Sequence, residues 1–155
     1  MPATRADAPG RPVSPDDERH VSPYTVVATR LTSETGEARI RSVVIPLDTR
    51  PVGRSEGVSA AELFLTAVAA AVLGGAERAA AALSFELTAA VVTVHGRYDG
   101  AETSTLGVDY DLAIATDEPD RRFVQFHEAL RGSEGVRRLG VAGGGLTGHL
   151  RRRPR

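Results

Sequence analysis

The clearest pattern in the chain is a strict alternation of apolar and polar or small side chains from residue 106 to residue 114. Its apolar members are Leu106, Val108, Tyr110, Leu112 and Ile114. A period of two predicts a strand with one face on a core and the other, carrying Asp109 and Asp111, in solvent. The valine-rich run 86–98 ends at a turn-forming Asp99-Gly100 and predicts the strand that pairs with it.

A long helix is predicted to begin at Ser59, because Ser59-Ala60-Ala61-Glu62 has the spacing of a capping box. The alanine-rich run that follows favours helix to about Leu83. From Leu63 to Leu73 only Thr66 is polar, so we expect this helix to be covered on nearly all sides. Gly74-Gly75 inside it predict a kink or a tight contact.

The apolar stretch Leu63–Ala76 is interrupted by Thr66 and two glycines. It falls well short of the ~20 residues that a membrane span needs. We therefore expect a buried helix in a cytoplasmic protein that does not enter the membrane.

Four further elements complete the predicted order. Val- and Thr-rich segments at 24–32 and 38–47, joined by a turn at 33–36, predict a hairpin. A second helix is expected from Pro119 to the stop at Gly132, and a last short strand at 146–150. The resulting order, ββ-α-ββ-α-β, predicts an α+β fold with mainly antiparallel pairing.

Composition fits one globular domain of 155 residues with 41% hydrophobic and 25% charged residues. Residues 1–21 are proline-rich and polar and predict a disordered arm before a domain at 22–150. Charge is uneven: residues 1–120 carry 10 Arg and 18 acidic residues, whereas residues 121–155 carry 9 Arg and 2 acidic residues. The basic tail 151–155 could contact phosphate, but no aromatic residues interleave with it, which argues against nucleic-acid binding.

The chain contains no cysteine, so it has no disulfide, thiolate metal site or thiol nucleophile. Its four histidines show no HxH or HExxH spacing. They are His20, His95, His127 and His149. We therefore expect neither a metal nor a cofactor.

The segment from Ser59 to Ala71 resembles the hallmark of the OsmC/Ohr family, Ser/Asn-Pro-Glu-Glu/Gln-Leu-Leu-Leu-Ala-Ala-Leu-Ala-Ala-Cys, at the start of a long central helix. The order of elements agrees, and the likeness covers roughly Tyr24 to Leu150. The resemblance implies an OsmC-like fold, with antiparallel sheets wrapped around the central helices of an intertwined homodimer. It also implies the family activity, the thiol-dependent reduction of organic hydroperoxides.

The residues that this activity needs are missing. The family's reactive cysteine falls on Ala71, its second cysteine on Glu134, and the Glu that helps to activate the thiol on Ala61. The activating arginine is best matched by Arg30. Peroxide reduction by thiols needs a thiolate and a resolving thiol, so this chain cannot perform it with its own residues.

What the resemblance leaves is an apolar pocket at the dimer interface. We expect a small, largely apolar organic molecule to bind there, and to be transformed, if at all, by a non-redox isomerase, cyclase or hydrolase. The expected pocket residues are Phe64, Thr66, Ala71, Arg50, Phe126 and His127.

The candidate catalytic residues are Glu134, Glu62 and Arg30. In an apolar cavity Glu134 would have a raised pKa and act as a general acid or base, but it could equally lie on an exposed loop. Glu62 could instead serve only as a helix cap, and Thr66 could bond back to its own helix. Arg30 and Arg50 could clamp an anionic end of a ligand or simply be solvated.

Two alternatives belong to other classes. The chain could be a non-catalytic structural or interaction dimer in the oxidative-stress context of the family. It could also be a nucleic-acid accessory that uses residues 151–155, in which case binding would depend steeply on salt.

Overall fold

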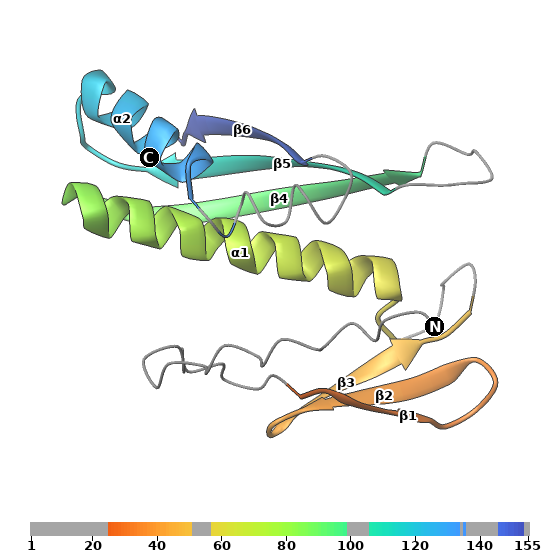
Figure 1. The fold of residues 1–155 in the computed structure, drawn as a ribbon. Helices are drawn as coiled ribbons and strands as arrows, with labels where there is room; N and C mark the ends of the chain where they lie inside the picture. Colours follow the sequence, from red (N-terminus) through yellow and green to blue (C-terminus); the bar gives the residue numbers. More distant parts are fainter. Residues whose placement is uncertain (1–24, 51–56, 99–105, 134, 136–145, 154–155) are drawn as a thin grey trace, which may run out of the picture.

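The computed structural model describes residues 25–50, 57–98, 106–133, 135 and 146–153. Eight elements follow one another along the chain (Figure 1). They are β1 (Val27–Arg30), β2 (Thr35–Ile40), β3 (Val43–Asp48), α1 (Ala60–Leu83), β4 (Ala89–Tyr98), β5 (Leu106–Ala115), α2 (Asp120–Arg131) and β6 (Leu146–Arg152). The α+β class is confirmed, but three strands precede α1 where the sequence predicted two.

The additional strand arises from a tight turn at Arg41-Ser42, which divides the segment predicted as one strand. Arg41 adopts a left-handed φ of 54°. A turn of this kind usually carries Gly, Asn or Asp, so the sequence offered no signal for it. Strands β1, β2 and β3 form an antiparallel sheet in that order, here called the N-terminal sheet.

The N-terminal sheet has one apolar and one mixed face. Paired residues share a face, so Ala38↔Ile45 and Ile40↔Val43 lie on the apolar side. The opposite side carries Arg39↔Val44 and a Glu37–Arg39 ion pair of 3.4 Å. On the apolar side Val43 is still 56% exposed. The described residues therefore do not cover this face completely.

Helix α1 begins as predicted. The Ser59 hydroxyl accepts from the Glu62 amide while the Glu62 carboxylate accepts from the Ser59 amide. The helix runs without interruption through Gly74 and Gly75. It ends at Ser84, whose left-handed φ of 46° is typical of a helix C-cap.

In the part of the chain that the structure describes, α1 buries one stripe of its surface. Its buried residues are Val68, Val72, Gly75, Ala76, Ala79 and Ala80. The expectation that the helix is covered on nearly all sides is therefore wrong for a single chain. The expectation that the apolar stretch is too short for a membrane span is also wrong, because the whole 24-residue helix α1 is long and apolar enough to pass that test. Core helices of soluble proteins pass it too.

The second sheet has the order β4-β5-β6, with β5 antiparallel to β4 and parallel to β6. Val108, Tyr110, Leu112 and Ile114 of β5 are all buried, which confirms the alternation seen in the sequence. Helix α2 closes the same core, where the rings of Phe85 and Phe126 stack 4.6 Å apart. We call α1, β4, β5, α2 and β6 together the C-terminal body. Figure 1 shows the N-terminal sheet on the opposite side of α1 from β4 and β5.

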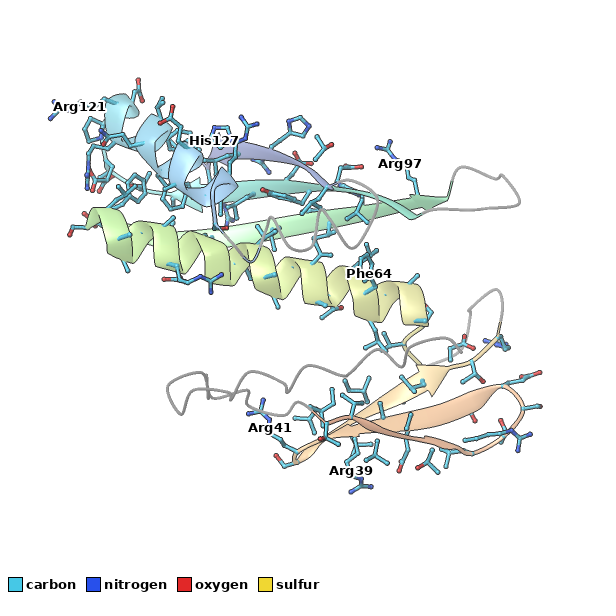
Figure 2. All side chains as sticks on the ribbon, viewed as in Figure 1. Arg39, Arg41, Phe64, Arg97, Arg121 and His127 are labelled. Carbon is cyan, nitrogen blue, oxygen red and sulfur yellow. The ribbon has the colours of Figure 1, made fainter. Side chains whose placement is uncertain are left out.

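The outer face of this sheet is polar, as predicted. Asp109 accepts from Arg97 at 2.6 Å, and Asp111 lies 3.9 Å from His95. Figure 2 shows Arg97 at the far end of β4, away from α2. The Arg97–Asp109 ion pair thus lies on the polar face of the sheet, opposite the core.

Part of the basic C-terminal segment is structural. Strand β6 continues to Arg152, beyond its predicted end at Leu150. The Arg152 guanidinium donates to the carbonyl oxygens of Thr116 and Glu118 at 3.2 and 2.8 Å and lies 5.0 Å from the centre of the Phe123 ring. Arg152 therefore secures β6 to the start of α2, which weakens the interpretation of this segment as a free phosphate-binding tail.

Candidate functional site

The position matched to the family's reactive cysteine, Ala71, lies in the middle of α1. Ala71 is half-buried and borders the buried stripe that contains Val68 and Val72. The chain after α2 returns to this point. A Cβ atom added to Gly135 would lie 3.9 Å from the carbonyl oxygen of Ala71. The tertiary structure thus brings α1 and the segment after α2 together at Ala71.

Arg78 borders the same spot. Its side chain runs back along α1, so that Nη1 would lie 3.3 Å from a Cβ atom added to Gly74, one turn earlier. Its Nη2 would lie 2.9 Å from a Cβ atom added to Gly135. Glycine at both positions leaves room for the guanidinium, so the tight contact expected at Gly74-Gly75 is made by a side chain of the same helix.

Glu134, the predicted acid or base, lies outside the described residues. Its neighbour Ser133 is described. The Ser133 hydroxyl oxygen is buried and has no hydrogen-bond partner among the described residues. A buried hydroxyl without a partner is uncommon and costs free energy.

Glu62 is occupied as a helix cap. Its carboxylate accepts from the Ser59 amide and from the Ser59 hydroxyl, both at 2.8 Å. These hydrogen bonds lower the pKa of Glu62, so the group stays ionised and is poorly suited to act as a general acid. Thr66, one turn later, donates to the Glu62 carbonyl oxygen at 2.8 Å and therefore bonds back to its own helix.

Arg50 borders a hollow of about 220 Å³ between the end of β3 and the start of α1. The lining residues are Leu47, Asp48, Thr49, Arg50, Val58, Ala60 and Leu63. Arg50 is not free to clamp a ligand, because its Nε and Nη2 each donate to one oxygen of Asp48 at 3.1 Å. This bidentate pair raises the pKa of Arg50. The Asp48 side chain, only 1% exposed, also accepts from the Arg50 amide at 3.0 Å and so stabilises this turn.

The remaining candidates lie apart from one another. Arg30 is exposed on β1, and Phe126 is fully buried in the core. Figure 2 shows Phe64 near the beginning of α1 and His127 on α2, well separated along the molecule. One chain thus does not gather the predicted pocket residues around a single hollow.

Within the described ranges no group of three or more His, Asp or Glu side chains is arranged to hold a metal ion. Two features escaped the sequence analysis, the Arg78 contact with Gly135 and the bidentate Asp48–Arg50 pair. The first has a weak signal, since Ala71, Gly74 and Arg78 are spaced to lie along one face of a helix. Nothing in the sequence indicates which segment covers that face.

The chain is similar to known proteins in its structure but not in its sequence. No protein-family model matches the sequence, and no curated protein matches it. Solved structures do match. An OsmC-like protein from Mycoplasma pneumoniae superposes with a TM-score of 0.68 at 18% identity, over 86% of this chain and 97% of that one.

Two organic hydroperoxide resistance proteins are also similar. OhrB of Bacillus subtilis matches with a TM-score of 0.60 at 16% identity, over 84% of this chain and 98% of its own. The protein from Elizabethkingia anophelis matches with a TM-score of 0.62 at 12% identity, over 87% and 99% respectively. The similarity spans nearly all of each neighbour, and this cysteine-free chain therefore has the OsmC-like fold shared by the OsmC and Ohr proteins.

Proposed function

We propose that this protein is a divergent, cysteine-free relative of the OsmC and Ohr proteins that binds a small, largely apolar organic molecule at the interface of a homodimer. The observation that carries the proposal is Ala71: the position matched to the reactive thiol holds a small inert side chain where two segments of the fold meet. We propose that any reaction there is non-redox: a chain without cysteine supplies no thiolate to attack a peroxide, so the thiol-based route has no residue to carry it.

The homodimer is supported by two apolar surfaces that the described residues leave open. One is the apolar side of the N-terminal sheet, where Val26 and Val43 are more than half exposed. The other is the flank of α1 that carries Ala67 and Ala70, both exposed. Exposed apolar patches of this kind mark interaction surfaces. A second copy would cover both and would explain why the apolar helix α1 has exposed alanines in one chain.

A pair of adjacent substitutions tests the homodimer. Val43 and Val44 are 56% and 46% exposed and lie on opposite faces of β3. We expect Val43→Lys to convert the dimer to a monomer, because it puts a charge on the apolar face, whereas Val44→Lys leaves the dimer intact. Native mass spectrometry measures both. A monomeric wild-type protein, or equal behaviour of the two variants, would refute this interface.

The ligand is tested on the same purified dimer. We expect native mass spectrometry to detect a retained organic molecule or, after a screen, binding of medium-chain apolar compounds. Ala71→Phe puts a bulky ring at the position matched to the reactive thiol and should weaken that binding. Unchanged affinity would show that the ligand does not bind at Ala71. For turnover we propose Glu134 as the general acid or base, and Glu134→Gln should then abolish turnover while binding persists.

The second candidate is a structural or interaction dimer without a ligand. It is favoured by the fact that one chain does not gather the predicted pocket residues (Figure 2). A dimer that retains no molecule and binds none in a screen would support it.

A further inference from the structure

We draw no further inference here: the strongest candidate, the cluster of His95, Asp111 and His149 on the outer face of the sheet β4-β5-β6, carries nothing, because its side chains lie on an exposed surface and no group of three such side chains among the described residues is placed to hold a metal ion.

Discussion

Apolar strand faces are buried in the C-terminal body but partly exposed in the N-terminal sheet. In the body, the alternating apolar residues of β5 are buried under α1 and α2, and Phe126 and Leu112 have no exposed surface. In the N-terminal sheet, the apolar face keeps Val43 more than half exposed. An amphipathic strand therefore reveals which of its faces needs a cover, but not whether the same chain provides that cover.

The two regions also differ in how their ends are held. In the body, Arg122 donates to the carbonyl oxygens of Leu83, the last residue of α1, and of its C-cap Ser84, both at 2.8 Å. Arg152 joins β6 to the α2 start. The N-terminal sheet is connected to α1 through a short junction, where Val58 bonds to Pro46 and Asp48 of β3. The body has the contacts of a self-sufficient core, and the sheet does not.

The largest effect on stability should come from the centre of the body. Phe126→Ala removes a fully buried ring that stacks on Phe85 and should lower the free energy of unfolding by about 3–5 kcal/mol. Val124, on the same helix, is 55% exposed. Val124→Ala should change the free energy of unfolding by less than about 0.5 kcal/mol. Urea unfolding followed by circular dichroism measures both, and equal losses would contradict the core described above.

A smaller effect is expected where β6 joins the body. The ring of Tyr110 lies directly over Gly148 on the neighbouring strand, in the space that a side chain would need. Gly148→Ala should therefore displace the ring and cost about 1–3 kcal/mol. Gly107→Ala on β5 is the control, because its nearest neighbour would be 3.6 Å away. If thermal unfolding shows the two variants to be alike, Tyr110 can move aside freely.

The smallest expected effect is on the pH dependence of the body. Hydrogen bonds from Arg122 and from the Glu86 amide lower the pKa of Glu118. Because the folded-state pKa lies below the unfolded value, the stabilisation is complete above the ordinary glutamate pKa and is lost as pH falls through the lowered one. Glu118→Gln should thus make stability fall less steeply between about pH 5 and pH 3. An unchanged slope in urea titrations across this range would show that Glu118 gains nothing from these bonds.

Several elements could be predicted because their signals are local. The capping box at Ser59 needs only four consecutive residues, and the alternation from Leu106 to Ile114 needs only nine. The turn at Arg41-Ser42 was missed because a left-handed arginine is stabilised by the strands on either side of it, not by its own preference. The sequence also could not show that the Arg50 guanidinium donates both of its hydrogen bonds to the Asp48 carboxylate.

The sequence by itself determined the α+β class, the start of α1, the buried face of β5 and the absence of any thiol, since each follows from residue identity and short-range spacing. Only the tertiary structure decided that α1 is half-covered, that Gly135 and Arg78 meet beside Ala71, and that the apolar side of the N-terminal sheet is left open. The physical reason is that burial and pairing depend on which segments, distant in the chain, come into contact, and local spacing carries no information about that choice.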